Sequence, residues 1–249
     1  MKETTPQFPT EEVTLPSKGL LYPEDSTLRK GTIEMKYMTA KEEDILTNQN
    51  YIEDGTVIDK LLQSLIVSPI DYDELLVGDK NAILIASRIL GYGKDYTFEW
   101  EGEIKTIDLT TIEDKNIGEN LLVEGINEFP FTLSAAKKEI TFKFLTHKDE
   151  KKISNELKGL KKLNKKSDPS ITTRMKYLIT SIGGDYEAKT IRNFVDNNLL
   201  AIDARELRKY IKNNQPDVDL SFEHEDDKGN FKKVMIPLGI SFFWPDVEL

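Results

Sequence analysis

The segment Gly78–Gly93, GDKNAILIASRILGYG, decides the fold, because it carries the clearest helical pattern in the chain. Asp79 is the predicted N-cap, and Gly91 occupies the predicted C-cap position. The apolar positions recur at helical spacing and would share one face of the helix. They are Ile83, Ile85, Ala86, Ile89 and Leu90. The segment is therefore predicted to be a helix that packs against a core.

Three patterns precede this helix. Gly31–Met38 alternates apolar and polar residues, which predicts a half-buried strand. Thr39–Glu42 has the spacing of a capping box and should open a short acidic helix. Thr56–Val67 places its apolar residues on one helical stripe, and Pro69 should end it. These patterns predict a strand–helix unit.

The first 31 residues hold four of the ten prolines and show no apolar periodicity. We therefore expect an extended arm in which Leu15–Pro23 runs over a surface. Such an arm usually binds something, so its side chains are candidates for contact with a partner. These candidates are Leu15, Pro16, Lys18, Leu21 and Tyr22.

Two extended pairs and a basic helix follow. Tyr96–Trp100 and Ile104–Leu109 flank the turn Glu101-Gly102 and predict a central hairpin. Phe129–Leu133 and Glu139–Leu145 predict a second extended pair. Thr146–Lys166 is predicted to be a Lys-rich helix, with a hinge at residues 164–170.

The rest of the chain predicts helices and one more hairpin. Three short helices are expected at Ile171–Ile182, Ala188–Leu199 and Asp203–Asn213. Val218–Glu225 and Phe231–Ile240 then predict a C-terminal hairpin. The class is therefore α+β, with an N-terminal extended arm (1–31), an α+β domain with a central hairpin (32–145), and a helical segment with a C-terminal hairpin (146–249).

Phe242, Phe243 and Trp244 form a run of three aromatic residues after this hairpin. On a strand, consecutive side chains point to opposite faces, and one hairpin cannot easily bury both faces. At least one face should meet a second surface, either a partner protein or another part of this chain. All three residues are therefore candidates for partner binding.

Composition limits the chemistry that the chain can perform. The formal net charge is −10, which disfavours general binding of nucleic acid. The absence of cysteine excludes disulfides, thiolate nucleophiles and Cys-ligated zinc. Only two histidines are present, His147 and His224, and the Gly91-Tyr92-Gly93 turn lacks the features of a phosphate loop. We therefore expect no catalytic residues, no metal and no cofactor.

Hydropathy and charge distribution add two expectations. No apolar window is long enough to span a bilayer, and the first residues lack the apolar stretch of a signal peptide, so a soluble protein that is not exported by that route is predicted. Residues 1–130 carry 12 Lys/Arg against 26 Asp/Glu, whereas residues 131–249 carry 22 against 18. This asymmetry either orients the protein between partners or reflects two ordinary solvated surfaces.

Four motifs occur in order along the chain, namely Leu15–Gly19 with Tyr22-Pro23, Met38–Thr47, Ile89–Gly93 and Phe242–Asp246. Together they resemble the baseplate hub and hub-assembly proteins of T4-like contractile-tailed phages. Many members of that family carry Cys-x-x-Cys zinc ribbons in hairpins like Trp100–Ile104 and His224–Asn230, which this sequence lacks.

The resemblance implies a non-enzymatic hub subunit or assembly chaperone that acts through protein–protein contacts. Its partners would be other phage tail and baseplate hub proteins, with the tape-measure protein as one candidate, and homo-oligomerisation stays open. No membrane partner is expected. The protein would act in the host cytoplasm during assembly and could remain in the tail baseplate of the virion.

Two other classes of function stay open from the residues. A nucleic-acid-associated assembly factor would use the Lys-rich helix at 148–166, in particular Lys148, Lys151, Lys152, Lys161 and Lys162. A phage cell-wall hydrolase would need a deep pocket that joins His147 or His224 to a carboxylate.

Overall fold

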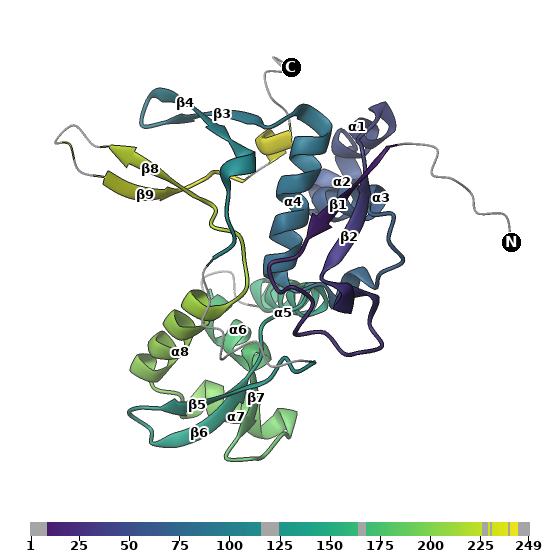
Figure 1. Ribbon diagram of the computed structural model, residues 1–249. Helices are drawn as coiled ribbons and strands as arrows, with labels where there is room; N and C mark the ends of the chain where they lie inside the picture. Colours follow the sequence, from purple (N-terminus) through teal and green to yellow (C-terminus); the bar gives the residue numbers. More distant parts are fainter. Residues whose placement is uncertain are drawn as a thin grey trace, which may run out of the picture.

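The computed structural model describes residues 9–115, 125–163, 168–225, 229, 231–238 and 240–243. It combines helices with small antiparallel sheets, which confirms the predicted α+β class (Figure 1). The described chain forms two parts. We call residues 9–115 and 217–243 the frame, and residues 125–215 the inserted unit.

The frame surrounds the helix predicted at Gly78–Gly93. Its regular elements are β1 (Thr10–Thr14), β2 (Thr32–Lys36), α1 (Ala40–Leu46), α2 (Gln49–Asp54), α3 (Val57–Leu65), α4 (Val77–Tyr92), β3 (Asp95–Trp100), β4 (Glu103–Asp108), β8 (Ser221–Glu225) and β9 (Phe231–Met235). Short 3₁₀ turns add η1 (Thr27–Lys30), η2 (Tyr72–Glu74), η3 (Leu109–Thr111) and η5 (Ile240–Phe243).

Local sequence signals for the helices before α4 are confirmed. Thr39 and Glu42 form a reciprocal capping box at the start of α1. The apolar stripe of α3 is buried, with Leu61, Leu62 and Leu65 fully inaccessible to solvent. Both signals act within one or two helical turns, so distant parts of the chain do not disturb them.

Both predicted ends of α4 are wrong. The helix begins at Val77, and Asp79 lies in its first turn, fully buried, rather than at the N-cap. Gly91 is still helical, and the C-cap is Gly93, whose φ of 84° favours glycine.

The N-terminal segment is not an extended arm, as far as the structure describes it. β1 pairs antiparallel with β2, with Val13 opposite Ile33. The chain between the two strands folds back on itself, and Leu15 N–H donates to the Gly31 carbonyl oxygen at 2.8 Å. The predicted division at residue 31 therefore falls inside one hairpin-like unit.

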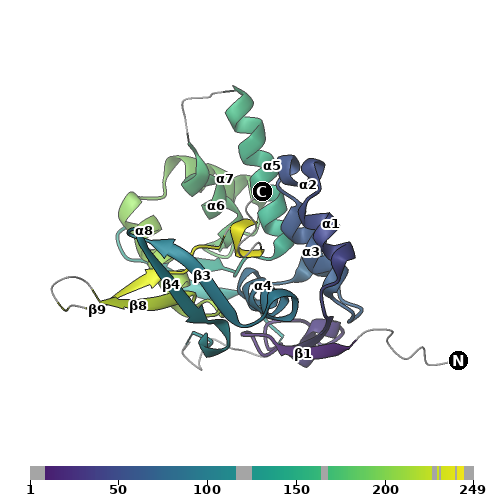
Figure 2. The same cartoon turned by 90° about the horizontal axis from the view of Figure 1, so that it is seen from above.

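The two hairpins predicted at β3–β4 and β8–β9 are confirmed, and both are antiparallel. They lie side by side in both views (Figures 1 and 2). Phe222 joins them, because its ring contacts Phe98 at 5.3 Å and Trp100 at 6.3 Å between centroids. The C-terminal hairpin thus completes the frame that the N-terminal half begins.

The inserted unit is a small sheet covered by helices. Its elements are β5 (Phe129–Leu133), β6 (Lys138–Phe142), α5 (His147–Leu163), α6 (Ser170–Leu178), β7 (Ile179–Ile182), α7 (Ala188–Asn197) and α8 (Ala201–Asn214). The helix predicted at Ile171–Ile182 is wrong in its last four residues, because α6 ends at Leu178 and Ile179–Ile182 form β7, which pairs with β6. The predicted domain boundary at residue 145 therefore divides a sheet of order β5–β6–β7.

The two linkers to the inserted unit run side by side. Asp114 and Val218 form an antiparallel bridge, and Lys115 N–H donates to the Asp217 carbonyl oxygen at 2.8 Å. The chain therefore leaves the frame and returns to it at one place, as is typical of an inserted domain. Of the predicted hinge at 164–170, residues 164–167 lie outside the described residues.

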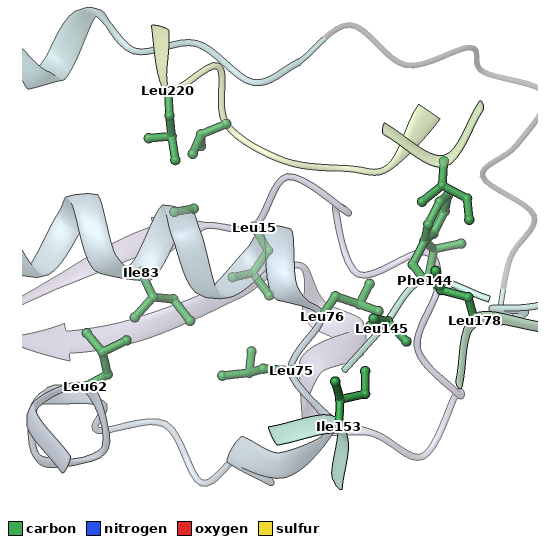
Figure 3. Packing of buried hydrophobic residues seen from close by; sticks show 14 of the residues in the cluster. Leu15, Leu62, Leu75, Leu76, Ile83, Phe144, Leu145, Ile153, Leu178 and Leu220 are labelled. Carbon is green, nitrogen blue, oxygen red and sulfur yellow. The ribbon is translucent and has the colours of Figure 1, made fainter. Parts of the chain in front are cut away.

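Frame and inserted unit share a buried core. Figure 3 shows Leu75 and Leu76 of the frame close to Leu145 and Ile153 of the inserted unit. Backbone hydrogen bonds reinforce the joint, since His147 N–H donates to the Leu75 carbonyl oxygen at 2.7 Å. Within the described ranges, no helix combines the length and apolar character needed to cross a membrane.

Candidate functional site: a cationic groove between α6 and α8

The predicted partner-binding residues of the N-terminal segment lie mostly inside the protein. Leu15, Leu21 and Tyr22 are 0%, 3% and 3% exposed, and Pro16 is also buried. Lys18 alone among the five is exposed. The core of the same chain covers the four buried side chains, so little of their surface is left for contact with a partner.

Asp79 of α4 explains why this segment folds inward. Its carboxylate accepts hydrogen bonds from Ser17 N–H at 2.9 Å, from Ser17 Oγ at 2.6 Å and from Tyr22 Oη at 2.6 Å. Tyr22 Oη in turn accepts from Leu76 N–H at 2.9 Å. Buried polar groups need such partners, so the cluster fixes the segment against α4.

The C-terminal aromatic residues are also internal. Phe242 and Phe243 are each 1% exposed, and they lie in the 3₁₀ turn η5 rather than on a strand. The ring of Phe242 packs edge-on against Tyr96 at 4.8 Å. Of the two surfaces that the sequence left open, a partner protein or another part of this chain, these two residues therefore meet the second, because the frame covers them. Trp244 lies outside the described residues.

The four motifs that carry the resemblance meet around α4. The first supplies Ser17 and Tyr22 to Asp79, near the start of the helix. The second supplies Met38, whose side chain covers Gly91 of the third motif. The fourth supplies the Phe242 carbonyl oxygen, which accepts from Arg88 Nε at 2.8 Å. These motifs therefore hold the frame together.

His147 is buried at the place where α3, α4, α5 and η2 meet. Its Nε2 is 3.7 Å from Asp59 Oδ2 and 3.9 Å from Asp73 Oδ1, and Lys80 Nζ is 3.4 Å from its Nδ1. The ring also packs edge-on against Tyr72 at 4.8 Å. Burial, helped by the charge of Lys80, lowers the pKa of His147 below its ordinary value. A histidine and a carboxylate are thus neighbours, but at a packed junction.

Some lysines of the Lys-rich helix α5 form ion pairs with carboxylates of the same chain. Lys148 Nζ is 3.5 Å from Glu74 and Lys151 Nζ is 2.9 Å from Asp73, so two of its cations pair with η2 of the frame. Charge complementarity between the acidic and basic halves therefore helps to join them. The other three predicted nucleic-acid contacts, Lys152, Lys161 and Lys162, are exposed.

The groove of greatest chemical interest lies between α6 and α8, beside the paired linkers. Its volume is about 300 Å³. The floor is apolar and consists of Leu145, Met175, Leu178 and Ile211, and Ile171 stands at the edge with 49% of its surface exposed. We call this site the α6–α8 groove.

Cations outnumber carboxylates around this groove. Lys115, Arg174, Arg208 and Lys212 line it, with Asp217 as the one acidic residue of its described lining. Lys115 pairs with Asp217 at 3.0 Å, and Arg174 forms a two-pronged pair with Glu150. Arg208 and Lys212 form no ion pair with any residue that the structure describes. The site therefore presents positive charge above an apolar floor.

The described residues also form two cavities away from this groove. One of about 370 Å³ is lined by Leu21, Tyr22, Lys148 and Lys152 among others, so it brings two predicted sets of site residues together. Of its three lysines, Lys143 pairs with Asp149 and Lys148 pairs with Glu74. The other, of about 320 Å³, lies between the linkers and the β8–β9 hairpin.

Neither histidine lines any of these three cavities. His224 is instead near Glu101, with 3.7 Å between Nε2 and Oε2. The described residues also hold no cluster of three or more His, Cys, Asp or Glu side chains suited to a metal ion. The arrangement most suited to a ligand is the α6–α8 groove, which can bind an anionic group attached to an apolar one.

Sequence reasoning did not find this groove. Its walls come from α6, α8 and the linkers, which are far apart in the sequence, so no local pattern connects them. The available signal was the pair Arg208 and Lys212, one helical turn apart beside the buried Ile211. Comparison of the chain with protein-family models, curated proteins and solved structures finds no significant match.

Proposed function

We propose that this protein is a non-enzymatic subunit or assembly chaperone of the baseplate hub of a T4-like phage tail, and that it acts through protein–protein contacts. The observation that carries the proposal is the meeting of four motifs around α4. The motifs that resemble the hub proteins are separated along the chain, yet their residues bind one another through Asp79, Arg88 and Gly91.

This observation supports a shared frame, because a motif that holds a core together constrains the fold. The chemistry of the described residues supports binding. Asp59, Lys80 and His147 are held in a packed cluster, whereas the α6–α8 groove is open and cationic. The partners proposed are other tail and baseplate hub proteins, including the tape-measure protein, and a second copy of this chain stays possible. The proposed location is the host cytoplasm during assembly. Retention in the virion tail is a separate proposal, which is tested below.

Co-expression with the hub and tape-measure proteins of a T4-like tail tests the proposal. The tagged chain should co-purify with at least one of them as a complex of defined mass in native mass spectrometry. An acidic phage protein of similar size from outside the tail serves as the control bait. If the chain forms no complex with any hub or tape-measure protein, the proposal is wrong.

Mass spectrometry of purified virions beside infected-cell lysate then separates the two roles. A retained subunit should appear in both samples, whereas a chaperone should appear in the lysate alone. The nucleic-acid alternative predicts instead a DNA affinity that falls steeply with salt and is lost in Lys161→Glu/Lys162→Glu.

A further inference from the structure

The α6–α8 groove differs in charge from the rest of the protein. The whole chain carries a formal net charge of −10, whereas four cations and one carboxylate line the described groove. A surface of locally reversed charge favours an acidic partner and disfavours a second cationic surface. The ligand of this groove is therefore expected to be anionic.

The floor of the groove limits the ligand further. Leu145, Met175, Leu178 and Ile211 offer an apolar surface within a volume of about 300 Å³. This volume is at the small end of ligand pockets and suits one large side chain. The described lining has no aromatic residue on which bases would stack, so a single-stranded nucleic acid fits it less well. The ligand should therefore combine negative charge with one apolar group.

The spacing of the two cations without ion-pair partners points to a peptide. Arg208 and Lys212 are one turn apart on α8, which corresponds to a rise of about 6 Å. In an extended peptide, residues i and i+2 lie on one side and are about 6.7 Å apart. Two carboxylates separated by one residue therefore match the two cations.

We propose that the α6–α8 groove binds an acidic segment of a partner protein, with one large apolar side chain on the floor and two carboxylates at Arg208 and Lys212. The inference rests on the proposed function, in which the chain acts through protein contacts. Lys115 and Arg174 keep their own carboxylate partners and complete the positive rim.

Fluorescence anisotropy with a labelled peptide tests the site in the full-length protein. The probe carries Glu-Ser-Glu-Ser-Leu in a Gly/Ser background, so that both carboxylates and the leucine lie on one side of an extended chain. Gln-Ser-Gln-Ser-Leu and Glu-Ser-Glu-Ser-Ala peptides are the ligand controls. Arg208→Glu/Lys212→Glu should weaken binding by about tenfold or more, because it reverses both charges. Arg205→Glu/Lys209→Glu makes the same change on exposed residues of α8 outside the described lining and should leave binding almost unchanged.

A second matched pair of variants tests the apolar contact. Ile171→Ser removes an exposed apolar side chain at the edge of the groove, whereas Ile202→Ser does so on α8 outside the described lining. Ile171→Ser should weaken binding of the Glu-Ser-Glu-Ser-Leu peptide and leave binding of the weaker Glu-Ser-Glu-Ser-Ala peptide unaffected. All four residues of the charge variants and both isoleucines are exposed, so circular dichroism should show native folding.

Each outcome decides the inference. Equal effects of the two charge variants, or equal affinity for the Gln-Ser-Gln-Ser-Leu peptide, would overturn it. Tighter binding of a short oligonucleotide, lost in Arg208→Glu/Lys212→Glu, would overturn it in favour of nucleic acid. If hub complexes form and survive this variant, the inference fails while the proposed function stands. If the peptide binds in the groove but no hub complex forms, the inference stands and the proposed function fails.

Discussion

Asp79 shows how one buried carboxylate can organise a distant segment. Burial raises the pKa of this group, while hydrogen bonds from Ser17 and Tyr22 favour its charged form. An unpaired buried carboxylate is costly, so the segment that supplies these donors is fixed in place. The exposed Lys18 has a φ of 51°, which is uncommon for a residue other than glycine, and it lies within this tightly turned segment.

Removal of the Tyr22 hydroxyl should destabilise the protein. Tyr22→Phe leaves a buried Asp79 oxygen with one donor fewer and Leu76 N–H without its acceptor. The expected loss in the free energy of unfolding is about 1–3 kcal/mol, measured by urea denaturation. Tyr37→Phe removes a hydroxyl that donates to Glu11 at the surface and should leave stability unchanged within error. Equal losses in the two variants would contradict the role of the Asp79 cluster.

Two glycines of α4 should tolerate substitution by alanine to different degrees. A methyl group at Gly78 would overlap the backbone of Pro216, which cannot move without disturbing the linkers. Gly78→Ala should therefore cost about 1–3 kcal/mol by urea denaturation, despite the higher helix propensity of alanine. At Gly91 the neighbour is the flexible end of Met38, so Gly91→Ala should cost less. A Gly78→Ala protein as stable as the wild type would contradict the close approach of helix and linker.

At the scale of residues, the features that depend on short-range contacts were predicted correctly from the sequence. The Thr39–Glu42 capping box is local, and its geometry is as expected. Burial would raise the pKa of Glu42, but hydrogen bonds from Lys36, Thr39 and Ser64 outweigh it and lower the pKa to about 2. Asp79 was assigned wrongly because its partners, Ser17 and Tyr22, lie about sixty positions earlier, and the intervening fold brings them together.

At the scale of elements, Arg88 determines where the C-terminal aromatic residues lie. Its guanidinium donates to the carbonyl oxygens of Phe242, Gly93 and Asp95 at 2.8, 2.9 and 3.2 Å. These three bonds join η5, the end of α4 and the start of β3. An aromatic run in the sequence indicates that the side chains need a surface, but it does not indicate which surface. Here the frame provides it.

His147 should make stability depend on pH near neutrality. Burial and Lys80 lower its pKa, while Asp59 and Asp73 act in the opposite direction. A lowered pKa in the folded state means that the unfolded state binds the proton more readily. The stability contribution is therefore complete above about pH 6.5 and decreases as the pH falls below that value.

The measurement is the free energy of unfolding by urea between about pH 7.5 and 5, above the range in which most carboxylates titrate. Wild type should lose stability across this range, by up to about 1.4 kcal/mol for each pKa unit of lowering. His147→Gln should show a flatter dependence, whereas His224→Gln keeps His147 and should resemble the wild type. Parallel curves for wild type and His147→Gln would exclude the effect.

Some helices and strands follow from the local sequence pattern, whereas others depend on contacts with distant parts of the chain. The hairpins β3–β4 and β8–β9 follow from alternation and turn residues, and the helices from apolar stripes. Ile179–Ile182 was assigned to a helix because it continues the pattern of α6. It becomes β7 because β6 offers an edge to pair with, and Ile179 and Ile182 are then buried. A single stretch of sequence does not show that edge.

At the scale of the whole molecule, the chain is a frame interrupted by an inserted unit. The sequence suggested three consecutive regions, because composition and charge change along the chain. The structure instead closes the frame with the C-terminal hairpin, through Phe222 against Phe98 and Trp100. The α6–α8 groove lies where the inserted unit meets its linkers, so this topology also creates the candidate site. Neither the insertion nor the groove is visible in any one segment.

The insertion predicts which fragments fold. Residues 125–215 keep the β5–β6–β7 sheet and its aromatic cluster, in which Phe131 and Phe142 contact Tyr210 at 5.2 and 5.8 Å. This fragment should unfold cooperatively on heating, followed by circular dichroism, with a lower midpoint than the full chain because it loses the core shared with the frame. Residues 146–249 lack β5 and β6, so β7 has no strand to pair with, and no cooperative transition is expected. A cooperative transition in 146–249 and none in 125–215 would contradict the insertion and restore a boundary at residue 145.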